Sequence, residues 1–291
     1  MEDRVSSQRA RAAVYPEVGC PPFLTVSAAL LLTMFFAQAN WAAPLGLGNR
    51  AAREAAEQRV PYAKLTAEAG RRIRQVVNKP TLYRRMSASQ ITCDPKMHRF
   101  LVRYPEVVVN IWQLMGITKV SAERTGPFMM NASDGVGTVT NVELVYGDQN
   151  THLMYCEGHY EGALFRKPLT GRCVLVLRAD YQTQPDGTVQ VSSTMDVFLQ
   201  VDNVAVDVVT RTLHPLVGKS ADINFEQSTR FIERVWQTTE ENGPGMTRLA
   251  FRLEQVQPEV RQQFADITRE VTVTAQQRPL INDGTRTARR P

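Results

Sequence analysis

The segment from residue 222 to 243 constrains the fold more than any other part of the chain. Its apolar and small residues recur at steps of three and four, which places them on one face of an α-helix. These residues are Phe225, Ser228, Phe231, Ile232, Val235, Trp236 and Thr239. Asp222 or Asn224 can cap the start of the helix, and Gly243-Pro244-Gly245 can end it. So wide an apolar stripe needs a large partner surface.

That partner is expected in the run before the helix, where the period of two is typical of β-strands. Strands are expected over residues 82–93, 117–123, 128–132, 136–146, 152–160, 164–166, 173–181 and 188–201. In the last of these, apolar residues alternate with polar ones such as Asp196, and Phe198 is the one apolar residue on the polar side. This alternation predicts an antiparallel strand with one buried face and one face exposed to solvent.

Shorter helices are expected on both sides of these strands. Residues 51–59 and 62–77 are rich in helix-forming residues, and residues 96–102 and 106–115 show helical periodicity. A further helix is expected from Asp202 or Asn203 to about His214, and a weaker amphipathic segment over 249–264 is interrupted by Pro258. From about Thr274 the polar composition predicts disorder.

The N-terminal segment has the pattern of an export signal. Arg4, Arg9 and Arg11 precede an uncharged apolar run over residues 23–36, and Ala37-Gln38-Ala39 follows it. This order predicts cleavage near Asn40 and export to the periplasm or cell envelope. The alternative is that the run stays uncleaved and anchors the protein through one N-terminal helix.

The domain organisation that we expect follows from these segments. Residues 1–39 are a signal peptide or membrane anchor, 40–80 a basic helical connector, and 81–243 a single α+β domain; residues 244–273 are an amphipathic extension and 274–291 a basic tail. The net charge of +5 is concentrated between Arg50 and Arg85 and in the tail. Basic segments beside a balanced domain favour a solvated or membrane-apposed surface over a nucleic-acid groove.

The order of elements between about Leu82 and Gly243 resembles that of the START-like superfamily. That order is a strand, two short helices, a run of antiparallel strands and a long C-terminal helix. The superfamily includes the Bet v 1-like proteins and the polyketide cyclases. The resemblance implies a helix-grip fold, in which a curved sheet packs on the long helix and a cavity between them holds lipids, sterols or other apolar molecules. It rests on element order, so no catalytic residue is carried over.

The lining of such a cavity is expected from the last strand and the long helix. The candidate residues are Val191, Met195, Val197, Phe231 and Val235. Several methionines and aromatic residues fit either a filled core or a cavity lining; they are Phe128, Met129, Met130, Met154, Met195 and Phe231.

Metal binding and catalysis have little support in the sequence. His152 and Cys156 share one face of a strand, but His159 falls on the other, so no tetrahedral site and no metal are expected. None of the carboxylates on or near the strands has an evident partner for acid–base chemistry; these are Glu143, Glu157, Glu161, Asp180 and Asp196. We therefore expect no catalytic residue and no cofactor.

The cysteines leave the redox question open. Signal cleavage removes Cys20 and leaves Cys93, Cys156 and Cys173, so at most one intramolecular disulfide can form. Burial as small apolar residues on strands is the simpler interpretation of each.

The function that these observations favour is that of an exported protein that binds an apolar small molecule or lipid between the sheet and the long helix. The basic segment between Arg50 and Arg85 would lie near a membrane surface. One alternative is a cyclase- or hydrolase-like enzyme that uses the same cavity. Another is a structural envelope protein with a filled core.

Overall fold

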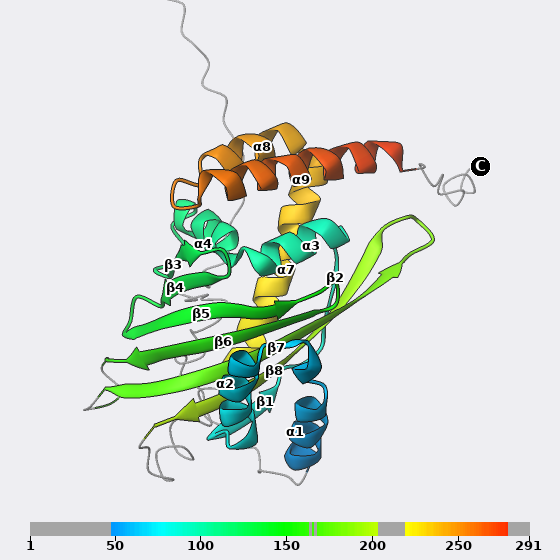
Figure 1. The fold of residues 1–291 in the computed structure, drawn as a ribbon. Helices are drawn as coiled ribbons and strands as arrows, with labels where there is room; N and C mark the ends of the chain where they lie inside the picture. The colour runs from blue at the N-terminus through cyan, green and yellow to red at the C-terminus, as the bar shows by residue number, and fades with distance from the viewer. Residues whose placement is uncertain (1–47, 163–164, 166–167, 203–218, 279–291) are drawn as a thin grey trace, which may run out of the picture.

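The computed structural model describes residues 48–162, 165, 168–202 and 219–278, which are organised around a twisted antiparallel sheet (Figure 1). Neighbouring strands follow the order β1-β8-β7-β6-β5-β4-β3, and β2 also pairs with β8. The strands are β1 (Leu82–Arg85), β2 (Ser89–Thr92), β3 (Ser121–Gly126), β4 (Met129–Ser133), β5 (Thr138–Gly147), β6 (Thr151–Tyr160), β7 (Leu169–Thr183) and β8 (Val189–Val201). The first expected strand is therefore present as two short strands that share β8 as their neighbour.

Two glycines allow the backbones of the sheet to approach closely near one end. Gly158 on β6 and Gly171 on β7 lie directly opposite each other. A Cβ atom on Gly158 would overlap the carbonyl oxygen of Val139 and lie 2.8 Å from the Cα atom of Thr140. A Cβ atom on Gly171 would lie 2.8 Å from the carbonyl oxygen of Gln200. Glycine in a strand interior marks such close approaches, so this part of the sheet requires residues without a Cβ atom.

Three helices cover one face of the sheet, which we call the inner face: α3 (Pro95–Arg103), α4 (Pro105–Leu114) and α7 (Lys219–Glu241) (Figure 1). The start of α3 is marked by Asp94, whose carboxylate accepts hydrogen bonds from the backbone N–H groups of Lys96 and Met97 at 2.8 and 2.9 Å. Pro105 lies in the first turn of α4, where a missing N–H group is tolerated. Both helices begin within a residue of the expected positions.

The stripe expected on the long helix is confirmed in α7. Phe225, Ile232, Val235 and Trp236 are buried in the inner core, and Ser228 and Thr239 of the same stripe are buried as well. Phe231 is half-buried and packs on Trp112 of α4, with ring centroids 5.2 Å apart. The helix therefore presents the predicted face to the sheet and to α4.

The N-terminal end of α7 differs from the expectation. The helix begins at Lys219, so Asp222 lies within its first turn and is not the capping residue. Instead, Asp222 forms an ion pair with Arg84 of β1, and its carboxylate accepts a hydrogen bond from the backbone N–H of Ser87 at 3.3 Å. A second carboxylate of α7, that of Glu233, accepts from the backbone N–H of Thr92 at 2.7 Å. These contacts join α7 to β1 and β2.

Two further helices extend the inner core beyond residue 243. Gly243-Pro244-Gly245 end α7 as expected, but they also begin α8 (Gly243–Phe251), whose start is capped by the side chain of Asn242. Pro258 starts α9 (Pro258–Gln277), which continues past the expected end of regular structure at Thr274. Phe264 of α9 is fully buried and stacks on Phe100 of α3 at 5.7 Å. The segment expected as an extension therefore belongs to the same core as the sheet.

The opposite, outer face of the sheet is covered by α1 (Gly48–Gln58) and α2 (Ala67–Asn78), with a short 3-10 helix (Tyr62–Lys64) between them (Figure 1). A second apolar cluster fills the space between these helices and the strands. It contains Ala56, Val60, Ile73, Val76, Val77, Tyr83, Leu153, Tyr155, Val174, Val176 and Phe198. The segment that we expected to be a solvated connector thus packs on the sheet.

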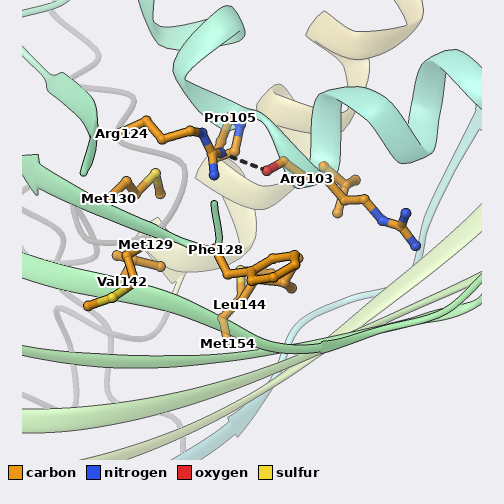
Figure 2. A pocket seen from close by; sticks show the side chains of 10 residues that line it. Arg103, Pro105, Arg124, Phe128, Met129, Met130, Val142, Leu144 and Met154 are labelled. Atoms are coloured by element: carbon orange, nitrogen blue, oxygen red, sulfur yellow. Dashed lines mark hydrogen bonds between the residues drawn. The ribbon is translucent and has the colours of Figure 1, made fainter. Parts of the chain in front are cut away.

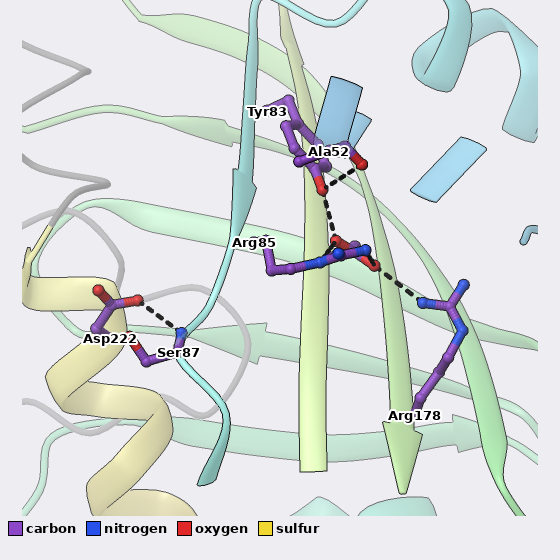
Figure 3. Close-up of polar contacts among 7 residues, drawn as sticks. Ala52, Tyr83, Arg85, Ser87, Arg178 and Asp222 are labelled. Atoms are coloured by element: carbon purple, nitrogen blue, oxygen red, sulfur yellow. Dashed lines mark hydrogen bonds and ion pairs between the residues drawn. The ribbon is translucent and has the colours of Figure 1, made fainter. Parts of the chain in front are cut away.

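The part of the outer face around Asp196 is consequently not exposed to solvent, which corrects the expectation for this residue. This residue does lie opposite the apolar side of β8, but its exposed fraction is 0%. Its carboxylate accepts hydrogen bonds from Arg85 Nε at 2.8 Å, from Arg178 Nη1 at 2.9 Å and from the Tyr83 hydroxyl at 2.7 Å. The same hydroxyl lies 3.1 Å from the carbonyl oxygen of Ala52 on α1 (Figure 3). Buried charge of this kind is tolerated only when it is paired.

Several expected features lie outside the described residues. These are the apolar run over residues 23–36 with its cleavage site, most of the strand at 164–166, the helix from about 203 to 214, and the tail beyond residue 278. Within the described ranges, no helix is both long enough and apolar enough to cross a membrane.

The fold class is α+β, as expected from the sequence. The inner face of an antiparallel sheet packs on a long helix that follows the last strand. Along the chain, two short helices come between β2 and β3. This is the arrangement of a helix-grip fold. The packed unit reaches from α1 to α9, so it includes residues on both sides of the expected 81–243 domain.

Candidate ligand-binding site

A pocket opens on the inner face of the sheet, between the corner that joins α3 to α4 and the strands β4, β5 and β6 (Figure 2). We call it the methionine pocket. Its lining consists of Val102, Arg103, Pro105, Arg124, Phe128, Met129, Met130, Val142, Leu144 and Met154. The cavity volume of the pocket is about 20 Å³. An enclosed space of that size holds roughly one water molecule.

The rim of the pocket is apolar and exposed. Phe128, in the turn between β3 and β4, has an exposed fraction of 64%, and Met129 at the start of β4 has one of 48%. The deeper residues Met130, Val142 and Met154 are buried. The pocket therefore leads from two exposed apolar side chains to the inner core.

One wall of the pocket is held by a buried ion pair between Arg124 of β3 and Glu106 of α4. Their side chains are 7% and 1% exposed, and Arg124 Nη2 lies 2.9 Å from Glu106 Oε2. Arg124 also donates to the carbonyl oxygens of Arg103 and Pro127, each at 3.0 Å, and its guanidinium stacks on the ring of Tyr104 at 4.7 Å. Because the charge is matched by Glu106 and the donors have acceptors, Arg124 is a structural part of the wall.

The second arginine of the lining, Arg103, directs its guanidinium away from the methionines (Figure 2). It donates from Nε to His152 Nε2 at 3.2 Å and from Nη2 to the carbonyl oxygen of Asp148 at 3.0 Å. The two arginines are the only residues with a charged side chain among those that line the pocket. What the pocket presents to a ligand is therefore mostly hydrocarbon and thioether.

Two buried histidines lie between α3 and the sheet beside this pocket. His98 of α3 and His152 of β6 are each 1% exposed, and His98 Nδ1 lies 2.9 Å from the Tyr181 hydroxyl. Burial, with the nearby His152 and Arg99, lowers the pKa of His98 to about 3. Burial and Arg103 lower the pKa of His152 to about 4. Both imidazoles are therefore neutral at pH 7, so Arg103 can donate to His152 Nε2.

The residues expected to line a cavity are brought together by the fold, but not at this pocket. Val191, Met195, Val197 and Val235 are buried in the inner core, and Phe231 is half-buried at its edge. None of the five is among the residues that line the methionine pocket. Their role in ligand binding stays a prediction.

The alternative interpretation of the methionines and aromatic residues is partly realised. Phe128, Met129, Met130 and Met154 meet in the methionine pocket, while Met195 belongs to the core and Phe231 packs on Trp112. Val142, Leu144 and Pro105 were not singled out from the sequence. The alternation of Val142 and Leu144 along the expected strand placed them on one face, but nothing local indicated that α4 would leave that face uncovered.

The other candidate residues are distributed over the molecule. His152 and Cys156 lie on the inner face of β6 and His159 on the outer face, as expected from the strand period. Within the described residues, no group of three histidine, cysteine or acidic side chains is placed to hold a metal ion. Cys156 and Cys173 lie opposite each other on β6 and β7 as free thiols, and burial raises the pKa of Cys156 to about 12.

The sequence matches no protein-family model and no curated protein. Among solved structures, the chain is similar to Ara h 8.0201, with a TM-score of 0.31 and 9% identity over 52% of this chain and 98% of that one. It is similar to the di-domain ARO/CYC protein BexL with a TM-score of 0.31 and 15% identity, over 55% of this chain and 52% of that one. For norcoclaurine synthase from Thalictrum flavum the TM-score is 0.31 and the identity 9%, over 53% and 93% of the two chains.

These structures are of the Bet v 1-like and polyketide cyclase type, the class that the order of elements resembles. At such low TM-scores and identities, the likenesses carry no argument about a ligand or an activity.

Proposed function

We propose that this protein binds an apolar small molecule or lipid on the inner face of its sheet, and that the ligand enters through the methionine pocket. The observation that carries the proposal is the meeting of Phe128, Met129, Met130 and Met154 around one pocket, in which the first two side chains are exposed and the last two belong to the inner core. Ligand pockets are lined mostly by apolar side chains with few polar groups. Contiguous exposed apolar side chains on a protein surface mark sites of this kind.

The polar groups of the lining support an apolar ligand over a charged one. Arg124 is paired with Glu106, and Arg103 donates to His152 and to Asp148 on the far side. A charged ligand group in this pocket would have to displace one of these contacts. A neutral apolar ligand leaves them intact and removes the exposed surface of Phe128 and Met129 from water.

Entry requires side chains of the lining to move. The cavity volume of about 20 Å³ is far below the range for small-molecule sites, roughly 300–1,000 Å³, so the pocket must widen to admit a ligand. Methionine side chains are unbranched and adapt readily to new neighbours. We expect Met129, Met130 and Met154 to change rotamer when the ligand enters.

A ligand longer than the pocket would have to part the packed inner core, because Leu175 and Val197 are 0% and 1% exposed. Met154 on β6 lies opposite Leu175 on β7, and Leu175 lies opposite Val197 on β8. This row crosses the inner face from the methionine pocket to the predicted lining residues Val197 and Met195. A long apolar chain would follow the row between the sheet and α7, where Val235 and Phe231 are expected to contact it.

Binding is tested by native purification, extraction with organic solvent and mass spectrometry of the extract, together with titration of the neutral apolar fluorophore N-phenyl-1-naphthylamine. The pocket is filled by Leu144→Trp, since Leu144 is only partly buried and lines the space. The matched control is Met115→Trp, at a side chain that is 58% exposed and outside the pocket. We expect roughly tenfold weaker fluorophore binding for Leu144→Trp and no change for Met115→Trp.

Other outcomes would favour the other functions. A protein that yields no extracted compound and does not bind the fluorophore would contradict the proposal and favour a structural role. Turnover of a co-purified compound would favour a cyclase- or hydrolase-like enzyme.

We also propose that the protein is exported, on the strength of the apolar run before Ala37-Gln38-Ala39. N-terminal sequencing of protein from the secreted or envelope fraction should begin at or near Asn40. An intact N-terminus recovered from the cytosol would contradict export, and an intact N-terminus in the membrane fraction would favour the uncleaved anchor.

A further inference from the structure

A second hollow lies over the outer face of the sheet, at the C-terminal end of α2. It has a volume of about 520 Å³ and is lined by Arg71, Arg74, Gln75, Asn78 and Lys79 of α2 and the following turn, and by Gln200 of β8. We call it the basic hollow. It opens to solvent on the side of the sheet opposite the methionine pocket, so the two sites share no residue.

The charges of the basic hollow are of one sign. Arg71, Arg74 and Lys79 are exposed, and none of them forms an ion pair with a carboxylate of the described residues. By contrast, Arg72 on the same helix pairs with Glu143 at 2.8 Å and stacks on Tyr155 at 4.9 Å. Three unmatched cations that share one hollow raise the local concentration of anions.

One of these cations is already positioned by an aromatic ring. The guanidinium of Arg74 lies 4.5 Å from the ring centroid of Tyr62, which belongs to the short 3-10 helix before α2. Stacking of this kind restricts the rotamers of the arginine without using its hydrogen-bond donors. Its N–H groups remain available to a ligand in the hollow.

Gln200 adds an unmatched acceptor to the basic hollow. Its Nε2 donates to the carbonyl oxygens of Gln75 at 3.3 Å and Lys79 at 3.2 Å, which satisfies carbonyl groups at the end of α2. These two bonds determine which end of the amide is the nitrogen. The opposite atom, Oε1, is buried and has no hydrogen-bond partner. A buried acceptor without a donor is unfavourable, so a ligand hydroxyl that donates to it would be stabilised. Because Oε1 is closed off from solvent, the side chains around it must shift for this hydrogen bond to form.

We infer that the basic hollow binds a phosphate group that carries a neighbouring hydroxyl, as in a polyol phosphate or a glycerol-type lipid headgroup. The phosphate oxygens accept from Arg71, Arg74 and Lys79, and the hydroxyl donates to Gln200 Oε1. Arginine presents paired donors that match phosphate oxygens, and charge-assisted bonds of this kind are stronger than neutral ones. The inference does not depend on the apolar ligand of the methionine pocket.

The test uses the full chain and four probes: inorganic phosphate, glycerol 3-phosphate, and phosphatidylcholine vesicles with or without phosphatidylglycerol. The hollow is neutralised by Arg71→Gln, Arg74→Gln and Lys79→Gln in one variant. The matched control removes the same charge from exposed positions elsewhere, through Lys119→Gln, Arg248→Gln and Arg252→Gln. Calorimetry measures the free probes and flotation measures the vesicles.

We expect the hollow variant to bind its preferred probe roughly 100-fold more weakly, while the control variant binds within about twofold of the unchanged protein. Binding of glycerol 3-phosphate would identify a soluble ligand, and binding only to phosphatidylglycerol vesicles would identify a headgroup. Equal losses in the two variants would overturn the site, because the attraction would then come from net charge alone. Absence of binding to all the probes would overturn it as well.

The hydroxyl is tested separately by Gln200→Met. The measured quantity is the ratio of the affinities for glycerol 3-phosphate and inorganic phosphate, or for vesicles that contain phosphatidylglycerol and vesicles that contain phosphatidic acid, which has an anionic phosphate but no headgroup hydroxyl. A general disturbance of α2 lowers both affinities and leaves the ratio unchanged. We expect the ratio to fall towards one in Gln200→Met, and an unchanged ratio would overturn the assignment of Gln200.

Discussion

The guanidinium of Arg85 donates two hydrogen bonds to the carboxylate of Asp196, at 2.8 and 3.1 Å, beneath helix α1 (Figure 3). Arg178 and Tyr83 complete the surroundings of this carboxylate. Burial alone would raise the pKa of Asp196, but the hydrogen bonds from Arg85, Tyr83 and Arg178 outweigh it, so the pKa lies below its ordinary value. The carboxylate is therefore charged at neutral pH and joins β1, β7 and β8.

Asp196→Asn should lower the free energy of unfolding by about 3 kcal/mol, because Arg85 and Arg178 lose their shared counter-charge. Urea denaturation followed by circular dichroism measures the effect. Asp180→Asn is the control, since Asp180 is exposed on β7 and forms no ion pair with a described residue; we expect a change below about 0.5 kcal/mol. Equal stability of Asp196→Asn and the unchanged protein would mean that the buried network contributes nothing.

The stabilisation from Asp196 also has a defined dependence on pH. Because its pKa is lower in the folded chain than in the unfolded one, the contribution is present above the unfolded value of about 3.8 and is lost as pH falls through the folded value. This loss belongs to strongly acidic solutions and does not overlap the histidine transition described below.

The position of Asp196 on β8 was predictable, but its environment was not. Successive side chains of a strand point to opposite faces, so the sequence alone places Asp196 on the face opposite to Val191 and Val197. What covers the second face is decided by Ile73, Val76 and Val77 of α2, more than a hundred residues earlier in the chain. Phe198, the apolar residue on the polar side, was the one local sign that this face is buried.

The same limit applies to the methionine pocket. Met130 and Met154 are brought together by the pairing of β4 with β5 and of β5 with β6, a register that no local pattern specifies. The apolar stripe of α7 was easier to predict, because Phe225, Ile232 and Trp236 lie within a few turns of one helix. Element types could therefore be predicted more fully than the places where elements leave a space between them.

The two buried histidines should make stability fall as the solution becomes moderately acidic. Their folded pKa values of about 3 and 4 lie below the ordinary value of 6.5, so between these limits the unfolded chain binds protons that the folded chain does not. The charged groups near them are Arg99, Arg103 and Asp148. We expect the free energy of unfolding to fall by about 2–3 kcal/mol between pH 7 and pH 5.5.

Urea denaturation at a series of pH values tests this expectation. His98→Gln and His152→Gln should each remove about half of the pH dependence between roughly pH 7 and 5.5. His159→Gln is the control, because His159 is exposed on β6, and it should leave the dependence unchanged. A flat stability curve in the unchanged protein would show that His98 and His152 are protonated without cost.

The stripe on α7 allows two aromatic truncations to be ranked. Trp236 is 6% exposed, so Trp236→Ala should cost about 3–5 kcal/mol of unfolding free energy. Phe231 is only half-buried and packs mainly on Trp112, so Phe231→Ala should cost roughly 2 kcal/mol. Thermal melts of both variants measure the order. Unchanged midpoints would mean that the stripe does not pack on the sheet as described.

Gly158→Ala should be among the most damaging small substitutions in the sheet. Its new methyl group would overlap the carbonyl oxygen of Val139 and lie 2.8 Å from Thr140 Cα, and both are backbone atoms that cannot turn aside. We expect a loss of about 3 kcal/mol or more, seen as a lower melting temperature and a lower soluble yield.

Gly126→Ala is the control: it is also on a strand, but the nearest atom to its Cβ is Met129 Cβ at 3.7 Å. Because this is ordinary van der Waals contact, Gly126→Ala should melt close to the unchanged protein. If Gly158→Ala had the melting temperature of the unchanged protein, β5 and β6 would be able to move apart at Gly158 without loss of packing. The close approach of their backbones would then not be a requirement of the fold.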